Sequence, residues 1–442
     1  MKPYTKNKVP GHSGIVIAQE LESTDKQEMT VDFNKINPDG SVTLTQSGQS
    51  AGFLSWSTYP KIIRESLAAI RWLILTKGAQ WVSFPFRFLS KSQTEAYLQS
   101  GQLVLYPANL VLLHEAVDLL DSEKQYFSQN LANNEPVRVW SYLPGKAGTK
   151  QLPYGGVVIN NKVLCNDTDH HDFYRNVRHR RKRTELHAKI LIAPWSHFQD
   201  GFIWGGYYDY LILLVGKLCR IKDVLPEADF KEAIVSYPLF NTPYEHEYLL
   251  LLGIEPERVV DSRTHQITFD RCILGDIGHW FYPNAADIAL IRKYILEKVP
   301  ETDPYAGNRI YISRAGRRHI LNEKELVGVL KNHGFQIIED VPRTIAEQVS
   351  IYRNARFIIG PHGASFSNIL WCRPGTYLFE LFSATYVPEH FHYLAELLQL
   401  RYTAYYYGTA DVENDHQSDG LEDSIYVDIT EIEQSLQKLL NS

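Results

Sequence analysis

The sequence is poor in cysteine, which excludes several kinds of site. Its four cysteines are Cys165, Cys219, Cys272 and Cys372, and no two of them lie close together in sequence. This spacing favours neither a thiolate metal site nor a redox pair. We expect all four to be reduced and mostly buried, as in a cytosol-like compartment.

Long apolar runs are missing as well. The stretch "MKPYTKNKVPGHSGIVIAQE" lacks the apolar core of a signal peptide. The longest apolar runs, "YLILLVG" and "RWLIL", fall far short of the ~20 residues that span a bilayer. The expected location is cytoplasmic, with peripheral contact at the inner face of a membrane as a second option.

The sequence also lacks an excess of positive charge. Its formal net charge is -6, from 45 Lys+Arg and 51 Asp+Glu, which argues against nucleic acid as a partner. Aromatic residues are plentiful instead. The 27 tyrosines and 8 tryptophans suit a cleft for sugars or bases, although tyrosines also fill ordinary cores.

Residues 1–150 predict an N-terminal α+β extension of unclear role. Helical spacing runs through "YPKIIRESLAAIRWLIL" (59–75), and "LVLYPANLVLLHEAVDLLD" (103–121) indicates a strand followed by a helix. The turn-rich stretch "PGKAGTKQLP" marks the end of this extension.

From residue 151 on, short apolar strands alternate with helical stretches. "HAKILIAP", "EAIVSYPL", "RVVD" and "RCILGD" are such strands, and the alternation restarts after the linker-like "PETDPYAGN". A capping box is expected at Asn322–Glu325 and another at Thr344–Glu347. The pattern is typical of parallel sheets covered by helices, so the predicted class is α/β, with one lobe in residues 151–300 and a second in 301–442.

The stretch "RFIIGPHGASFSN" (356–368) is a strand end with a glycine-rich turn. Gly360 and Gly363 let the backbone approach a ligand closely, and the following helix start offers free N–H groups. His362, Ser365 and Asn368 can add side-chain donors. The expected ligand is a phosphate or diphosphate. The alternative is an ordinary strand-to-helix turn whose histidine satisfies a backbone carbonyl.

A second strand end, in "YISRAGRRHILNE" (311–323), is rich in arginine. Ser313 and Arg314 end the strand, and Arg317 and Arg318 follow. The planar guanidinium fork suits phosphate oxygens. A solvated basic turn is the alternative. Two such strand ends in one lobe favour a shared anion site.

Together with "EQVSIYRNARFIIGPHGASFSNILWCRPGTYLFEL", "LLLLGIEPERVVDS" and "CILGD", these stretches resemble glycosyltransferase family 61. That family includes plant xylan-modifying transferases, animal O-GlcNAc and O-mannose-chain enzymes, and bacterial capsule and lipopolysaccharide proteins. The resemblance covers roughly residues 153 to 408. It implies a GT-B fold, in which two Rossmann-like lobes face a cleft and the C-terminal lobe holds the nucleotide-sugar. It also implies inversion at the anomeric carbon without a bound metal.

The resemblance implies His362 as a catalytic residue that faces the leaving diphosphate. It also implies a donor-binding set at the matching positions: Ser313, Arg314, Arg318, Gly363, Ala364, Ser365, Asn368 and Glu380. Glu380 would bind ribose hydroxyls, unless it is a strand-end carboxylate paired to a neighbour.

The base that deprotonates the acceptor is expected from the N-terminal lobe. There the family usually shows an asparagine and a histidine, whereas this chain has Gly206 and Asp209 in "WGGYYDYLILL". A carboxylate is an adequate base for a hydroxyl, so Asp209 is the candidate. Its alternative role is a helix-start aspartate stabilised by the helix dipole.

Two further motifs keep alternative interpretations. "CNDTDHHD" contains Asp167 and Asp169 at the spacing of a metal-dependent GT-A site, and Asp169-His170-His171 is similar to a phosphoesterase motif. We interpret it as a polar loop and expect no metal or other cofactor. The basic run "RNVRHRRKR" (175–183) is either a solvated loop or a docking segment for an acidic glycan or an anionic lipid surface.

The sequence therefore predicts an inverting, metal-independent glycosyltransferase. It would move a hexose or pentose from a nucleotide-sugar donor to a glycan or lipid-linked glycan acceptor, as in capsule or lipopolysaccharide assembly. Two alternatives stay open: a sugar-nucleotide hydrolase or epimerase of GT-B fold, and a non-catalytic protein that binds sugar nucleotides or glycans.

Overall fold

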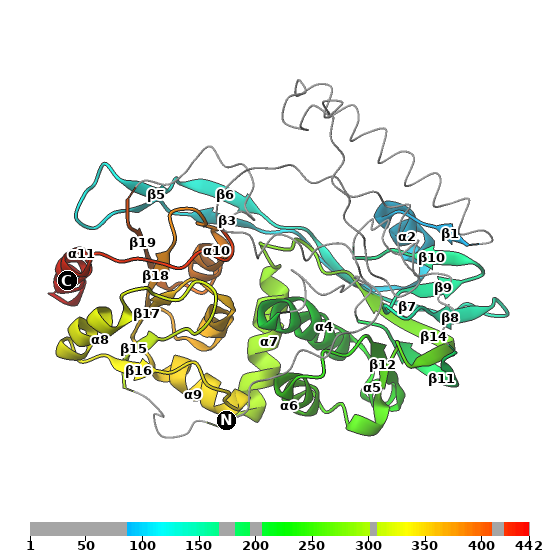
Figure 1. The fold of residues 1–442 in the computed structure, drawn as a ribbon. Coiled ribbons are helices and arrows are strands. Elements are labelled where there is room, and N and C mark those ends of the chain that lie inside the picture. The colour runs from blue at the N-terminus through cyan, green and yellow to red at the C-terminus, as the bar shows by residue number, and fades with distance from the viewer. Residues whose placement is uncertain (1–85, 168–181, 195–205, 301–306, 409–419, 442) are drawn as a thin grey trace, which may run out of the picture. The chain divides into compact units, whose positions relative to one another are not determined.

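The computed structural model describes residues 86–167, 182–194, 206–300, 307–408 and 420–441. The chain divides into the units Met1–Arg71 and Trp72–Ser442, and every described residue belongs to the second (Figure 1). The helix predicted in residues 59–75 lies outside the described residues. Within the described ranges, no helix is both long and apolar enough to cross a membrane.

A five-stranded sheet is built entirely from residues after the linker. All its neighbouring strands are parallel. Their order across the sheet is β16 (Gln336–Ile338), β15 (Arg309–Ile312), β17 (Phe357–Pro361), β18 (Tyr377–Phe382) and β19 (Arg401–Tyr406). Strands β17 and β18 are buried almost throughout, as the continuous apolar runs predict.

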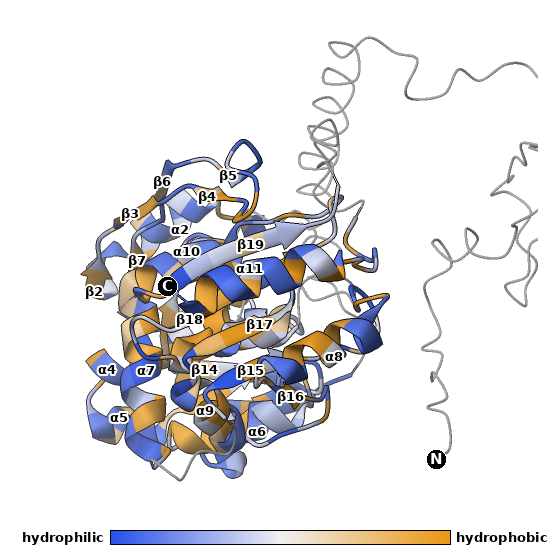
Figure 2. Ribbon diagram, turned by 90° about the vertical axis from the view of Figure 1, so that its left-hand side faces the viewer, coloured by the Kyte–Doolittle hydropathy of each residue, from blue (hydrophilic) through white to orange (hydrophobic). Residues whose placement is uncertain are grey.

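Helices cover both faces of this sheet. Because side chains alternate along a strand, Tyr311 and Ile359 pack with α8 (Glu323–Asn332) and α11 (Ile429–Asn441) on one face. Ile310 and Ile358 pack on the other face with α9 (Ile345–Asn354), the 3₁₀ helix η5 (Ala364–Trp371) and α10 (His390–Leu397). Figure 2 shows α8 and α11 beside the sheet, each with a hydrophobic and a hydrophilic side.

A six-stranded sheet precedes it in the chain. Its order is β13 (Val259–Asp261), β12 (Ile234–Tyr237), β11 (Thr184–Ile192), β14 (His265–Gly275), β7 (Val137–Tyr142) and β2 (Gln102–Tyr106). The first four strands are parallel, and β7 and β2 are antiparallel additions. The predicted α/β class is confirmed.

One face of the six-stranded sheet packs against helices and the other against α2 and more strands. The helices of this part are α2 (Lys91–Leu98), the 3₁₀ turn η2 (Gln99–Gly101), the π-helix η3 (Asp209–Val215), α4 (Gly216–Val224), α5 (Glu227–Glu232), α6 (Pro243–Leu251), the 3₁₀ turn η4 (Pro256–Arg258) and α7 (Ala285–Lys298). A four-stranded sheet runs in the order β1 (Arg87–Phe88), β10 (Lys162–Leu164), β9 (Val157–Ile159) and β8 (Thr149–Gln151).

The helix predicted within residues 103–121 is wrong. The structure has β2, β3 (Leu110–Leu113) and β4 (Ala116–Val117) there. Strand β3 pairs with β6 (Asn130–Asn133), and β4 pairs with β5 (Gln125–Phe127). Exposed residues alternate with partly or fully buried ones along β3, which is the strand period. The predicted boundaries at residues 150 and 300 stay predictions, although β2 and β7 share a sheet with β11 and β14.

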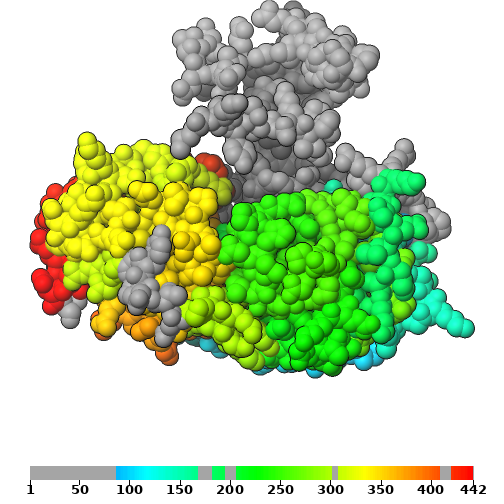
Figure 3. Space-filling view, turned by 90° about the horizontal axis from the view of Figure 1, so that it is seen from below, coloured from blue at the N-terminus to red at the C-terminus, as the bar shows by residue number. Residues whose placement is uncertain are grey.

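Helices that belong to the two sheets touch one another. The amide of Ile345, at the start of α9, donates a hydrogen bond to Glu247 of α6 at 2.7 Å. Arg292 of α7 donates to the carbonyls of Leu370 and Cys372, the latter at 3.1 Å. Figure 3 shows the green and yellow surfaces of these segments in contact. One buried cluster accordingly includes apolar residues of both α7 and α9.

Candidate functional site

The glycine-rich turn that follows β17 is fixed by backbone contacts with the neighbouring strands. The His362 amide donates to the carbonyl of Leu381 on β18 at 2.8 Å. The helix expected after the turn is present as the 3₁₀ helix η5. Gly360 packs against β15, because a Cβ there would lie 2.9 Å from the carbonyl oxygen of Ile312.

Arg314 lies on this turn, so the two predicted strand ends meet. Its Nη1 donates to the His362 carbonyl at 3.2 Å, and its Nε donates to the Arg317 carbonyl at 2.8 Å. A Cβ at Gly363 would lie 1.4 Å from Arg314 Nη1. With Arg314 in this position, only a glycine fits at residue 363. The expectation that this glycine makes room for a ligand stays a prediction.

Arg318 lies near the same turn, and both it and His362 lie close to the ring of Tyr386. It is 5% exposed and has a backbone φ of 58°, in the left-handed region. Its guanidinium lies 5.4 Å from the centre of the Tyr386 ring, and the His362 ring lies 5.5 Å from the same ring. The Nε of Arg318 is buried without a hydrogen-bond partner among the described residues. Such an orphaned donor is unusual in a folded protein.

His362 is held by a buried carboxyl group. Its Nδ1 lies 2.6 Å from Glu380 Oε1, and the Tyr402 hydroxyl donates to Glu380 Oε2 at 2.7 Å. Glu380 is 0% exposed, so both of its oxygens are engaged inside the protein. This is the neighbour-paired alternative for Glu380, and its predicted ribose contact stays a prediction.

Burial determines the protonation states of Glu380 and His362. It raises the pKa of Glu380 to about 8, against the lowering effects of the Tyr402 hydrogen bond and of Arg318. It also holds the pKa of His362 well below its usual value, assisted by nearby His390, Arg318 and Arg314. At neutral pH the carboxyl group therefore keeps its proton and the imidazole is uncharged.

Burial also lowers the pKa values of the two arginines next to this pair, Arg314 and Arg318. Burial, together with repulsion from Arg318 and Arg317, lowers the pKa of Arg314 to about 10. Burial also lowers the pKa of Arg318, with repulsion from Arg317 among the smaller causes. Cationic groups thus gather where water is scarce, beside a carboxyl group that is mostly neutral. An anion bound among them would relieve their repulsion and replace their lost hydration.

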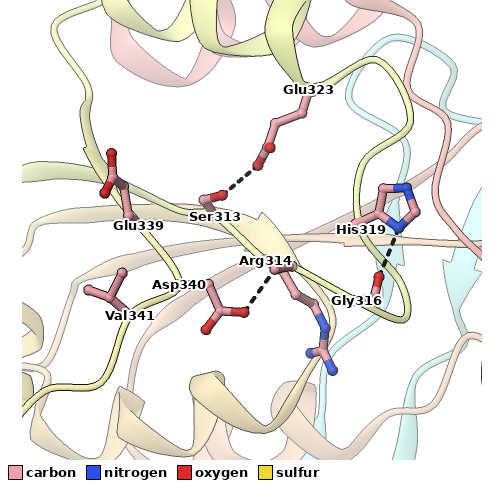
Figure 4. A pocket seen from close by; sticks show the side chains of 9 residues that line it. Ser313, Arg314, Gly316, His319, Glu323, Glu339, Asp340 and Val341 are labelled. Carbon is pink, nitrogen blue, oxygen red and sulfur yellow. Dashed lines mark hydrogen bonds between the residues drawn. The ribbon is translucent and has the colours of Figure 1, made fainter. Parts of the chain in front are cut away.

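Beside Arg314 lies a hollow of about 560 Å³ (Figure 4). It lies at the ends of β15 and β16 and is lined by Ser313, Arg314, Ala315, Gly316, His319, Glu323, Glu339, Asp340 and Val341. The Ser313 hydroxyl donates to Glu323 at 2.7 Å, and Asp340 accepts from the Ala315 amide at 2.9 Å. Ser313 thus lines this hollow with its hydroxyl bonded to Glu323. Its predicted contact with the phosphates stays a prediction.

The η5 residues named as donor ligands are engaged by the protein. Asn368 Oδ1 accepts from the hydroxyl of Tyr207 at 2.8 Å and from the indole of Trp371 at 2.9 Å. Its Nδ2 donates to Gln348 at 2.8 Å. The carbonyl of Ser365 accepts from a tyrosine hydroxyl at 2.9 Å. Asn368 thus links η5 to the helix that begins near residue 207, while Ala364 and Ser365 form its first turn.

Asp209 lies at the start of the π-helix η3 and is 5% exposed. Its Oδ2 accepts from the Gly206 amide at 3.2 Å. This contact fits the helix-start alternative. Its role as the base stays a prediction. Tyr207 and Tyr208, just before it, reach toward η5 and α10.

A cluster of aromatic and imidazole rings next to His362 was not predicted from the sequence. The rings of Phe281 and His390 stack at 4.5 Å, and His390 lies 6.1 Å from His362. Phe281 follows β14 in the run His279-Trp280-Phe281-Tyr282. Four consecutive rings after a predicted strand end were the available signal. His390 had none, because it begins α10 far from any predicted strand end.

The remaining motifs lie apart from this site or outside the described residues. Asp167 forms a fully buried ion pair with Lys217 at 2.6 Å, while Asp169, His170 and His171 lie outside the described residues. So does the basic run 175–183 except for its last two residues. Of these, Arg183 donates to backbone carbonyls, including that of Ser262 at 2.9 Å. Among the described residues, no three His, Cys, Asp or Glu side chains are grouped to hold a metal ion.

Comparison with known proteins gives a family match. The family model described as "Glycosyltransferase 61" matches residues 155–379, just over half of the chain. No curated protein matches the sequence. The matched range includes the Arg314 strand end and the His362 turn. It ends just before Glu380 and His390.

Proposed function

The chain belongs to the glycosyltransferase 61 family, and on this premise we propose that it is an inverting, metal-independent glycosyltransferase. Membership itself supports the transfer of a sugar from a donor to an acceptor. The proposal adds a nucleotide-sugar donor, a glycan or lipid-linked glycan acceptor, and a GT-B arrangement of two lobes about the site. A role in capsule or lipopolysaccharide assembly at the inner face of a membrane belongs to the same proposal.

The observation that carries the proposal is the meeting of Arg314 with the His362–Gly363 turn. Arg318 adds a buried guanidinium with an orphaned Nε next to the half-buried Arg314. Breaking the bond from a sugar to a diphosphate leaves negative charge on the phosphate oxygens. Without a metal, fixed cations and N–H donors must stabilise that charge, and a dry site strengthens their effect.

His362 is suited to be one of those donors. Glu380 holds its proton at neutral pH because burial raises its pKa to about 8, so it can donate to Nδ1 of His362. The imidazole then carries its own proton on Nε2. An Nε2–H can donate to the leaving phosphate. Glu380 thus acts as a positioning residue for His362 in this proposal, in place of a ribose ligand.

The nucleoside has a suitable place beside the arginines. The hollow of about 560 Å³ is of the size that small-molecule sites have, and Arg314 borders it. Glu339 and Asp340 line it at the end of β16. Acidic side chains at such a strand end suit ribose hydroxyls. We assign them that role within the proposal.

The test is nucleotide release from a panel of sugar nucleotides, with and without oligosaccharide acceptors. Release that requires an acceptor supports the proposal, and activity should survive a chelator. Release at the same rate in water alone indicates a hydrolase. Binding of the nucleotide without turnover of any panel member indicates a non-catalytic protein.

A further inference from the structure

The His390 ring lies where elements of the five-stranded sheet meet connections of the six-stranded sheet. It begins α10, which packs against β19 and η5 of the five-stranded sheet. Its ring stacks face to face on Phe281, from the loop after β14, at 4.5 Å and 4°. It also lies 6.3 Å from the ring of Tyr208, in the turn before Asp209. Elements from both sheets therefore fix this imidazole.

The hydrogen bonds of His390 are incomplete. Its Nδ1 is buried and has no hydrogen-bond partner among the described residues. The ring contacts of Phe281, Tyr208 and His362 hold the His390 ring without using its nitrogens. A buried, unpaired ring nitrogen is costly unless it has a function or a ligand. In this position, the missing partner is a group that arrives with a substrate.

We propose that His390 is the base that removes the proton from the acceptor hydroxyl. The inference rests on the proposed transferase function and replaces Asp209 in that role. Asp209 already accepts a hydrogen bond from the Gly206 amide, as a helix-start aspartate does. The ring centres of His390 and His362 are 6.1 Å apart, so an acceptor oxygen at His390 would lie close to a phosphate held at His362.

The chemical step balances without a further reagent. The acceptor O–H bond breaks and its proton passes to the lone pair of the neutral His390 imidazole. The acceptor oxygen forms a bond to the anomeric carbon while the bond from that carbon to the diphosphate oxygen breaks. The bonding electron pair leaves on the phosphate, beside Arg314 and Arg318. The imidazolium returns its proton to solvent after the products leave.

His390 has the protonation state that a base needs. Burial, together with repulsion from Arg318 and His279, lowers its pKa to about 4. The N-terminal end of α10 also disfavours a positive charge. The titratable and charged groups around it are Arg318, His279, His362, Tyr208 and the adjacent Glu389. A bound diphosphate would add negative charge to this group and raise the pKa of His390. Donor binding would thus strengthen the base.

The first test needs no turnover. Histidine ring carbons of the full chain are followed by NMR from pH 4 to 9, with and without uridine, guanosine or adenosine diphosphate, and His390→Gln assigns the signal. We expect a neutral ring at pH 7 in the free protein and a higher pKa when a diphosphate is bound. A ring that is protonated at pH 7 without ligand, or unaffected by a bound diphosphate, overturns the inference. If none of the three diphosphates binds, the proposed donor site fails instead.

The second test measures the reaction. His390→Gln should bind the diphosphate as the wild type does but transfer the sugar about a hundredfold more slowly. It should also lose the acidic limb of the pH profile of kcat, and imidazole should partly rescue His390→Ala. His333→Gln, a half-buried histidine near α8 that pairs with Glu433, is the matched control and should retain the wild-type rate. A wild-type rate and pH profile in His390→Gln, with Asp209→Asn inactive, would return the role to Asp209.

Discussion

Removing the Arg314 side chain should weaken binding of a nucleoside diphosphate by about a hundredfold. A guanidinium has five N–H donors. Nε–H and one Nη1–H of Arg314 are used on the carbonyls of Arg317 and His362. Three N–H donors remain for phosphate oxygens. Two charge-assisted bonds together contribute about 3 kcal/mol, which corresponds to about a hundredfold in Kd.

The assay is isothermal titration of the full chain with the nucleoside diphosphate that the wild type binds best. Arg314→Lys should fall between wild type and Arg314→Ala, because it keeps the charge and loses the planar fork. Arg317→Ala is the matched control. Its side chain is 45% exposed and pairs with Glu422 at 3.0 Å, while its carbonyl, which anchors Arg314, is retained. We expect this control to bind as the wild type does.

Folding must be checked in the same samples. Arg314→Ala loses two hydrogen bonds to backbone carbonyls, so its free energy of unfolding should fall by about 1–2 kcal/mol in urea. That loss leaves a folded protein at room temperature. A folded Arg314→Ala protein that binds the diphosphate with wild-type affinity would refute the role of this arginine.

Three further outcomes are expected. Gly363→Ala should weaken diphosphate binding in the same titration, but by less than Arg314→Ala, because its Cβ would lie 1.4 Å from Arg314 Nη1 and displace the guanidinium without removing its charge; unchanged affinity would contradict this. Glu380→Gln should gain stability relative to wild type as pH rises from about 5 to 8 in urea titrations. The folded-state pKa of Glu380 is raised to about 8, so the wild type loses the stabilisation of the protonated carboxyl group over that range; a pH-independent difference would count against the raised pKa. A chelator should leave sugar transfer unchanged, and loss of activity restored by a divalent cation would revive the metal interpretation of Asp167 and Asp169.

The strands and helices between residues 309 and 382 were predictable because their signals are local. Buried parallel strands read as continuous apolar runs, and the Thr344–Glu347 capping box is present as predicted. The capping box predicted at Asn322–Glu325 is wrong. Asn322 lies at the helix start, but its side chain is bonded to the backbone of Val427. Because Val427 is so distant in sequence, no pattern near Asn322 could predict this contact.

The meeting of Arg314 with the His362 turn followed from topology. Both segments end parallel strands, and β15 and β17 are neighbours in the sheet. The carboxyl ends of neighbouring parallel strands lie together, so their side chains converge. The sequence could not show which of the predicted ligand residues form hydrogen bonds within the protein instead. The bonds of Asn368 to Tyr207 and of Glu380 to His362 depend on packing between distant segments.

Residues 103–142 show the limit of reading periodicity. Their apolar residues fit a helix and a strand about equally over short stretches. The partners of β2 and β3 are β7 and β6, which lie further along the chain. Antiparallel pairing with those strands decides the conformation. His390 was missed for a related reason, since its neighbours Phe281 and Tyr208 come from the other sheet's connections.

The most direct measurement is a crystal structure of the full chain with its preferred nucleoside diphosphate. We predict phosphate oxygens within hydrogen-bonding distance of the Arg314 and Arg318 guanidinium groups and of His362 Nε2, with the ribose beside Glu339 and Asp340. A diphosphate bound elsewhere, with these arginines and His362 left without contact to it, would contradict the donor site on which the account rests.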